Sequence, residues 1–167
     1  MNVTDSIEQQ DSHWMNYALQ LADKAEAQGE IPVGAVVVAD NQIIGEGWNQ
    51  SILLHDPSAH AEMIAIRQAG KVLQNYRLVN ATLYVTLEPC PMCAGLLVHS
   101  RIARLVYGAA DYKTGAAGSV MNITTHQQLN HQIEVLGGVE AQRCADKISA
   151  FFKLRRAEKK AIKLKKD

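Results

Sequence analysis

The sequence predicts a three-layer α/β/α domain with a mixed five-stranded sheet, and it predicts that residues 1–167 form one domain. Helical and extended patterns alternate in the order α-β-β-α-β-α-β-β-α, which is typical of a sheet covered by helices. The extended segments 81–87 and 104–108 are joined through a helical segment, so we expect these two strands to be parallel. A length of 167 residues with 47% hydrophobic and 20% charged residues is ordinary for a single globular domain.

The N-terminal part of the chain predicts a helix followed by a hairpin. Asp11 or Ser12 can cap the helix, apolar residues then recur on one face, and Gly29 is the expected end. The apolar run 33–39 predicts a buried strand. Residues 42–48 predict a second strand, and the polar turn between the two segments makes them a hairpin.

The middle of the chain predicts two further helices with a strand between them. Residues 49–57 are expected to be a loop, and Asp56-Pro57 predicts the start of a helix that ends at Gly70. β-Branched and aromatic residues predict a strand over 81–87. The segment 91–102 begins with a proline and predicts the third helix.

The C-terminal part predicts two strands and a long helix. Strands are expected over 104–108 and 132–136. The region 109–130 is small and polar, and it is not assigned to any element. Two glycines then precede a helix that covers about 140–167.

The charges are balanced in number but not in position. The chain has 17 Lys and Arg and 17 Asp and Glu, yet residues 151–167 hold eight basic and two acidic residues. The C-terminal helix is therefore basic, while the rest of the chain is mildly acidic. This distribution favours a polyanionic partner such as a nucleic acid, and the alternative is a solvated tail without a partner.

The sequence indicates a cytoplasmic protein with no membrane partner. No apolar run approaches the roughly 18 residues of a membrane span. The N-terminus is polar and lacks the pattern of a signal peptide. Three cysteines are too few and odd in number for a disulfide framework, so closely spaced cysteines are candidates for metal binding or redox chemistry.

Two short motifs carry the candidate chemistry. His60-Ala61-Glu62 lies at the start of the second predicted helix, and Cys90 and Cys93 lie at the start of the third. Zinc favours cysteine sulfur and histidine nitrogen in tetrahedral geometry. His60, Cys90 and Cys93 would supply three ligands and leave one position open for water, which is the arrangement of a catalytic rather than a structural zinc site.

Glu62 is the candidate proton shuttle beside that water. Residues two apart do not share a helix face, so His60 and Glu62 can converge only if the ion lies beyond the helix N-terminus. Taken alone, a His-x-Glu is usually a helix surface, and a Cys-x-x-Cys can be a redox pair, a closed zinc site or two buried thiols. Both motifs together, in this order, match the signature of zinc deaminases.

At these residues the sequence resembles the cytidine/deoxycytidylate deaminase superfamily. The wider chain, from Trp14 to Arg156, resembles the bacterial tRNA-specific adenosine deaminases, which make inosine at the wobble position. The segments that carry this resemblance are IPVGAVVV, IGEGWN, HDPSAHAE, NYRL, ATLYVTLEPCPMCAG, HSRI, DYKTGAAGS and FFKLRR. The first dozen residues and residues 120–136 lie outside it or match loosely.

The resemblance implies a cytidine-deaminase-like fold, one Zn²⁺ per subunit, a homodimer, and a tRNA anticodon stem-loop as the substrate. It implies that His60, Cys90 and Cys93 bind the zinc and that Glu62 is catalytic. It also implies a set of substrate-binding residues: Asn49, Ala61, Asp111, Lys113, Phe152, Arg155 and Arg156.

Two alternatives remain open. One is a zinc deaminase of free nucleosides or nucleobases such as cytidine or guanine, which would not need the basic C-terminal helix. The other is a non-catalytic RNA-binding subunit, which would not need Glu62. The third cysteine, Cys144, falls on the apolar stripe of the last helix and is expected to be a core residue. Of the pair Phe151-Phe152, one ring is expected to face the core and the other to be free to stack on a base.

Overall fold

The computed structural model describes residues 3–166, so the first two residues and the last residue of the predicted domain lie outside the description. A single chain of helices and strands runs through this range. Its elements are, in order, α1 (Val3–Ala27), β1 (Gly34–Ala39), β2 (Gln42–Trp48), α2 (Ala61–Leu73), β3 (Thr82–Leu87), α3 (Pro91–His99), β4 (Arg104–Ala109), β5 (Glu134–Gly137) and α4 (Ala141–Leu164).

The five strands form one mixed sheet in the order β2-β1-β3-β4-β5. β1 is antiparallel to both of its neighbours, whereas β3, β4 and β5 are mutually parallel. The predicted parallel pairing of the segments at 81–87 and 104–108 is therefore confirmed. Because β2 and β3 are both antiparallel to β1, the carboxyl ends of β2, β3 and β4 all lie at the same edge of the sheet.

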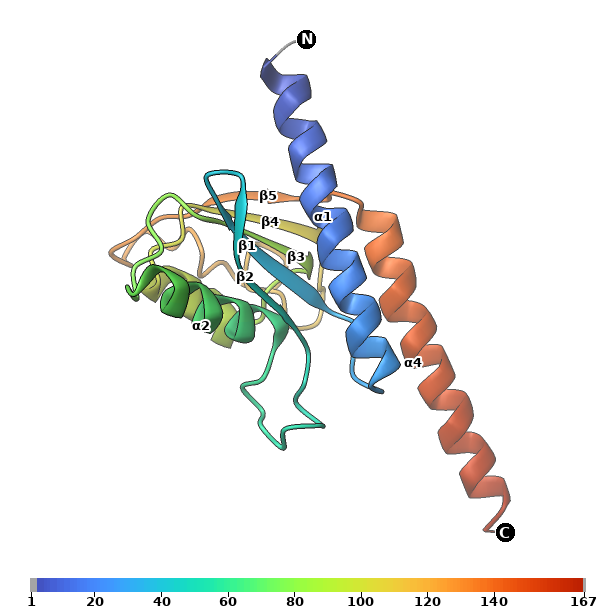
Figure 1. The fold of residues 1–167 in the computed structure, drawn as a ribbon. Coiled ribbons are helices and arrows are strands. Elements are labelled where there is room, and N and C mark those ends of the chain that lie inside the picture. The colour runs from blue at the N-terminus through green and yellow to red at the C-terminus, as the bar shows by residue number, and fades with distance from the viewer. Residues whose placement is uncertain (1–2, 167) are drawn as a thin grey trace.

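Helices cover both faces of the sheet, which confirms the predicted three-layer α/β/α architecture. α1 and α4 lie side by side on one face, and α2 lies on the other (Figure 1). β1 has no polar face because both of its faces are covered by helices. Ala35 and Val37 pack in the cluster that includes α2 and α3, while Val36 and Val38 pack in the cluster that includes α1 and α4. Successive side chains of a strand alternate between faces, so a continuous apolar run suits a strand that is covered on both sides.

α1 begins at Val3, eight residues before the predicted cap. Asp11 does not cap a helix end. It is buried within α1, and its carboxylate binds the Arg104 guanidinium through two contacts of 2.6 and 2.7 Å and accepts a hydrogen bond of 2.9 Å from the Tyr84 hydroxyl. The prediction of a cap here was wrong because the Asp11 carboxylate binds side chains of β3 and β4 and not the backbone N–H groups of a helix terminus.

α2 also differs from its prediction at both ends. The Asp56 carboxylate accepts hydrogen bonds from the backbone N–H and the hydroxyl of Ser58, at 2.8 and 2.7 Å, so it stabilises a turn and not the first turn of a helix. The helix begins at Ala61 and continues through Gly70 to Leu73. Gln74, and not a glycine, takes the left-handed conformation at the C-cap, with φ of 50°.

The remaining boundaries shift by a few residues. α3 ends at His99, earlier than the predicted 102, and β5 covers Glu134–Gly137 where 132–136 was predicted. The unassigned region 109–130 consists of turns with one isolated bridge between Ala117 and Asn122. Short strands are fixed by pairing with their neighbours, which a single sequence does not display.

α4 confirms the predicted C-terminal helix, and its distal half projects beyond the rest of the molecule (Figure 1). Phe151 is buried at 7% exposure and Phe152 is 41% exposed, so the predicted division between the two rings is confirmed. Cys144 is buried against the sheet, as predicted. Among the residues described, no helix combines the length and the apolar character that crossing a membrane requires.

Candidate active site

Three potential metal ligands meet where two helices begin. His60 is the N-cap residue of α2, Cys90 is the N-cap residue of α3, and Cys93 lies in the first turn of α3. The Nδ1 atom of His60 is 3.6 Å from the Sγ atom of each cysteine. All three ligand atoms lie within 4.8 Å of one another.

These separations fit a tetrahedral zinc ion. With Zn–S near 2.3 Å and Zn–N near 2.1 Å, tetrahedral geometry places nitrogen and sulfur ligands about 3.6 Å apart. The two nitrogen–sulfur distances in the structure have this value. One imidazole and two thiols therefore fit three positions of a zinc site and leave the fourth to a non-protein ligand.

The backbone explains how His60 and Glu62 can serve one site although they are only two residues apart. His60 is extended, with φ of −76° and ψ of 155°, and so lies outside the helix that begins at Ala61. Glu62 belongs to the first turn of the same helix. The condition set by the sequence, that the ion lie beyond the helix N-terminus, is thus met.

The sheet brings the two helix N-termini together. Three residues separate the end of β3 from the start of α3, and Pro91 occupies the first position of that helix, where its missing N–H costs nothing. On the other side, an added Cβ at Gly47 of β2 would overlap the backbone of α2 at Ala61, so glycine allows the helix to lie close to the sheet. Both helix dipoles then direct their positive ends toward the thiols, which stabilises thiolates.

The pKa shifts of Cys90 and Glu62 suit metal binding and proton transfer, whereas the hydrogen bond with Cys90 and burial raise the pKa of the Cys93 thiol. Hydrogen bonds from Cys93 and from His60 lower the pKa of the Cys90 thiol to about 4. Burial raises the pKa of Glu62 to about 7, and this side chain is only 4% exposed. A carboxyl group with a pKa near neutrality can both accept and release a proton at physiological pH.

A cavity of about 500 Å³ opens over this cluster. Asn49 follows β2, Glu88 follows β3, and Ala110 and Asp111 follow β4, so three carboxyl strand ends contribute to one site. The residues that line it are Ile31, Val33, Asn49, His60, Glu62, Leu87, Glu88, Cys90, Ala110, Asp111, Tyr112, Lys113, Thr114, Ile148 and Phe152. Cys93 is fully buried behind the cavity.

Four of the predicted substrate-binding residues line this cavity, namely Asn49, Asp111, Lys113 and Phe152. The Asn49 side-chain oxygen also accepts a 2.9 Å hydrogen bond from the backbone N–H of Ala61. Ala61 itself is buried in the core, so the predicted contact of this residue is limited to its backbone. The Asn49–Ala61 bond links the base of the cavity to the first turn of the helix that carries Glu62.

The two predicted arginines of α4 lie in different surroundings. Arg155 lies over the ring of Phe151, 5.1 Å from its centroid, and donates a hydrogen bond to the Gly29 carbonyl. Arg156 lines a smaller cavity of about 270 Å³ together with Lys113 and Phe152, which also line the larger one. Of the two, only Arg156 lies beside the candidate active site.

Several cavity residues were not singled out from the sequence, including Ile31, Glu88, Tyr112, Thr114 and Ile148. Glu88 offered no usable signal, because most glutamates lie at the surface and the burial of this one depends on how the later loop folds over it. The apolar members offered none, since their role depends on which loops and helices fold over the strand ends.

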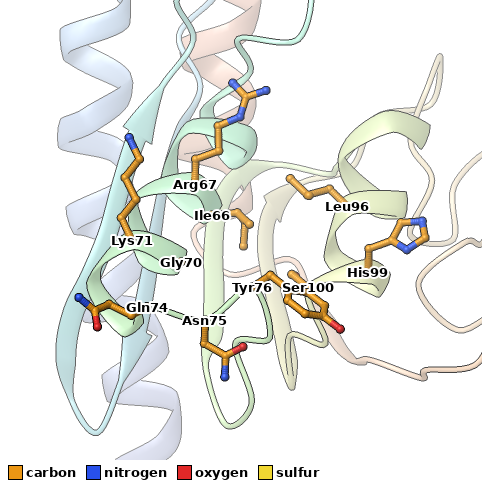
Figure 2. Close-up of a pocket in the computed structure, with 10 residues that line it drawn as sticks. All are labelled: Ile66, Arg67, Gly70, Lys71, Gln74, Asn75, Tyr76, Leu96, His99 and Ser100. Carbon is orange, nitrogen blue, oxygen red and sulfur yellow. The ribbon is translucent and has the colours of Figure 1, made fainter.

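A second cavity, of about 620 Å³, lies away from the metal ligands, on the outer side of α2 and α3. Figure 2 shows its side chains: Ile66, Arg67 and Lys71 come from α2, and Leu96 and His99 come from α3. It contains none of the three potential metal ligands and does not contain Glu62. Although this cavity on α2 and α3 is larger than the one over the metal ligands, it is not the candidate active site.

The fold and the ligand set define a zinc-binding deaminase class, and a comparison of sequences agrees. The family described as the cytidine and deoxycytidylate deaminase zinc-binding region matches residues 8–109 of this chain. This range includes His60, Glu62, Cys90 and Cys93. The chain belongs to the cytidine and deoxycytidylate deaminase family.

Within this family, several relatives share one name. The tRNA-specific adenosine deaminase of Haemophilus influenzae is 62% identical over 154 residues, covering 92% of this chain and 89% of that protein. The tRNA-specific adenosine deaminase of Bacillus subtilis is 47% identical and covers 92% of this chain and 96% of that protein. A solved structure from a study of A-to-I editing by tRNA:A34 deaminases at the wobble position is 41% identical with a TM-score of 0.78, over 81% of this chain and 98% of that one. This likeness confirms the predicted cytidine-deaminase-like fold.

Proposed function

We propose that this chain hydrolyses the exocyclic amine of adenosine at the wobble position of a tRNA anticodon, which leaves inosine and releases ammonia. The observation that carries the proposal is the juxtaposition of His60, Cys90 and Cys93 with the buried carboxyl of Glu62 in one cavity. The names and high identity of the relatives support adenosine in tRNA as the substrate.

His60, Cys90 and Cys93 would hold one zinc ion per chain, and this ion would supply the Lewis acidity that makes water a nucleophile at neutral pH. Glu62 accepts a proton from the attacking water while the water oxygen bonds to the ring carbon that carries the amine. Glu62 then gives this proton to the adjacent ring nitrogen. Glu62 then moves the second proton of the former water, now on the new hydroxyl group, to the amine nitrogen. The carbon–nitrogen bond breaks, the hydroxyl becomes the carbonyl of inosine, and ammonia leaves.

The other cavity residues bind and orient the nucleotide. Asn49 faces the flipped base and, through its bond to Ala61, fixes the start of α2. Asp111 and Lys113 lie on the loop that follows β4, and both line the same cavity. Phe152, exposed at the margin, provides a ring on which a neighbouring base can stack.

An RNA substrate also accounts for the charge of α4. Lys113 and Arg156 line a small cavity that adjoins the active site, and two cations beside a base-binding cavity suit the phosphates on either side of a flipped nucleotide. A base in the anticodon loop costs less to unstack than one in a duplex. A tRNA substrate supports a cytoplasmic location for the reaction.

The outer face of α2 and α3 is proposed as a homodimer interface. The cavity on this face includes Ile66 and Leu96, and Tyr76 beside them is 70% exposed (Figure 2). Met92, one turn before Leu96 on α3, is 39% exposed. A second copy of the chain would cover these apolar side chains, and exposed apolar surfaces of this kind are typical of interfaces.

The proposal is tested by giving the zinc-loaded protein whole tRNA, an anticodon stem-loop RNA, free adenosine and free cytidine. We expect inosine at the first anticodon position of both RNAs, and little product from either nucleoside. Turnover of a free nucleoside equal to or faster than that of tRNA would instead support the nucleoside deaminase alternative. Binding of RNA without release of ammonia from any substrate would support the non-catalytic alternative.

A further inference from the structure

Glu88 is a buried carboxylate that the proposed chemistry does not use. It lies between the end of β3 and the start of α3, and it is 2% exposed. Its side chain is among those that line the active-site cavity. A charged group seldom occupies such a position unless hydrogen bonds compensate its loss of water.

Both oxygens of Glu88 accept hydrogen bonds from a single loop. Oε1 accepts the backbone N–H of Asp111 at 3.2 Å and the hydroxyl of Ser119. Oε2 accepts the backbone N–H groups of Ala117 and Ser119 at 3.0 and 3.1 Å. The four donors all belong to residues 111–119, the loop that forms one wall of the cavity.

Besides Glu88, the loop is held by a 2.8 Å hydrogen bond from the Ala116 backbone N–H to the Pro89 carbonyl and by the burial of Ala116 and Ala117. It forms no strand, and its one β-bridge joins Ala117 to Asn122 within the same region. Gly115 lies so close to the Glu88 carboxyl that a Cβ at this position would overlap it. The loop is therefore folded around the carboxylate, and it presents Asp111 and Lys113 to the cavity from that fixed position.

We propose that Glu88 is a positioning residue, which holds loop 111–119 against the cavity so that Asp111 and Lys113 meet the RNA in a fixed register. The inference rests on the proposed function, because it assigns the loop to substrate binding. Glu88 does not act as an acid or a base: its oxygens are occupied by four donors, and only the ionised carboxylate can accept all of them.

Glu88→Gln tests the hold on the loop without any substrate. Glutamine keeps the shape of the side chain but turns an –NH₂ group toward N–H donors, so at least two of the four hydrogen bonds are lost. We expect faster backbone amide hydrogen exchange at Asp111, Ala117 and Ser119, with exchange in β3 unchanged. Glu134→Gln is the matched control, since the Glu134 side chain is 76% exposed on β5 and bonds to no loop residue in this set.

Kinetics with the stem-loop RNA then test whether the position of loop 111–119, fixed by Glu88, matters for substrate binding. Loop contacts bind the ground state and the transition state alike, so Glu88→Gln should raise KM at least about tenfold and change kcat less than about threefold. Zinc content should stay equal to that of the unaltered protein. Gly115→Ala, which displaces the same carboxyl from the other side, should raise KM as well, and the double variant should be less than additive.

Loss of zinc in Glu88→Gln would overturn the proposal, because Glu88 would then support the metal ligand Cys90. Unchanged amide exchange, or an unchanged KM in the presence of faster exchange, would overturn it too. Absence of RNA deamination by the unaltered protein is a different failure: it refutes the proposed function, while the exchange measurement still decides whether Glu88 holds the loop.

Discussion

Glu62 combines burial with proximity to the metal ligands, and burial raises its pKa to about 7. Because Glu62 is not one of the three ligands, Glu62→Ala should retain zinc, the fold and RNA binding. Turnover should fall by at least the roughly 10²–10⁴-fold that is typical of a lost general acid–base group. Ammonia release, zinc content and RNA affinity measured on the same preparation check this, and near-normal turnover would show that Glu62 transfers no proton.

Substitutions of the three cysteines should have different effects on the zinc content of the protein. Cys90 and Cys93 lie within bonding range of one ion with His60, whereas Cys144 is buried among α1, α4 and the sheet, where burial raises its pKa to about 11. Cys90→Ser should therefore lose most of its zinc, because a hydroxyl does not replace a thiolate ligand. Cys144→Ser is the control and should keep it; elemental analysis decides, and zinc loss in the control would contradict the ligand assignment.

Single residues were predictable from the sequence where the chemistry is local. His60, Glu62, Cys90 and Cys93 stand in two short motifs, and the structure brings all four to one place. Glu88 was missed because its meaning depends on donors 23 to 31 residues further along the chain. Spacing along the sequence carries no record of such contacts.

At the scale of the element, α4 has two kinds of basic residue. Arg156 shares a small cavity with Lys113, so Arg156→Ala should weaken binding of the stem-loop RNA and reduce the salt dependence of that binding by about one ion. The thermal stability of the protein should not change. Filter binding or fluorescence anisotropy over a range of salt concentrations measures this effect.

Arg155→Ala is the matched comparison on the same helix. Arg155 is bound to the Gly29 carbonyl and stacked on Phe151, and so it ties α4 to the end of α1. Its loss should lower the free energy of unfolding by about 1 kcal/mol and affect the salt dependence less than Arg156→Ala. The reverse pattern would show that Arg155 is the residue in contact with phosphate.

A partly buried ion pair joins α1 to the sheet. Asp11 binds Arg104 of β4 and the hydroxyl of Tyr84 of β3, and replacing it leaves a partly buried guanidinium without its partner. Asp11→Ala should lower the free energy of unfolding by about 3–5 kcal/mol in denaturant titrations. Glu134→Ala removes the exposed partner of the same Arg104, at 3.5 Å, and should cost at most about 1 kcal/mol. Equal costs would contradict the assignment of Asp11 as the fastening residue.

The helices α1 and α2 show which features of a helix the apolar periodicity of the sequence predicts and which it does not. The apolar stripe located the part of α1 that packs on the sheet. The helix also includes residues 3–10, which lack that stripe and were not predicted, and residues 3, 4 and 6–10 are exposed. Asp56-Pro57 has the composition of a helix start, yet the Asp56 carboxylate accepts a hydrogen bond from the Ser58 backbone N–H within a turn. The helix α2 begins only at Ala61. Periodicity reports burial, and helix ends are set by which polar groups find partners.

At the scale of the whole molecule, the sheet separates two tasks. The carboxyl ends of β2, β3 and β4 build the cavity over the metal ligands, and α4 brings Phe152 and Arg156 to its margin. The outer side of α2 and α3 has a different character, with a cavity that includes Ile66 and Leu96. One copy can therefore bind a second copy without covering its own catalytic cavity.

Tyr76→Lys combined with Leu96→Lys tests this second surface. Two added charges on each copy would face their counterparts across a twofold interface, where like charges and buried ammonium groups are both unfavourable. The unaltered protein should sediment at twice the mass of one chain, and the variant should sediment as a monomer that still contains zinc. Ile162→Lys with Leu164→Lys is the control, because these side chains are 58% and 68% exposed at the far end of α4. A monomeric unaltered protein at micromolar concentration would refute the dimer, and a control that dissociates equally would place the interface on α4 and not on α2 and α3.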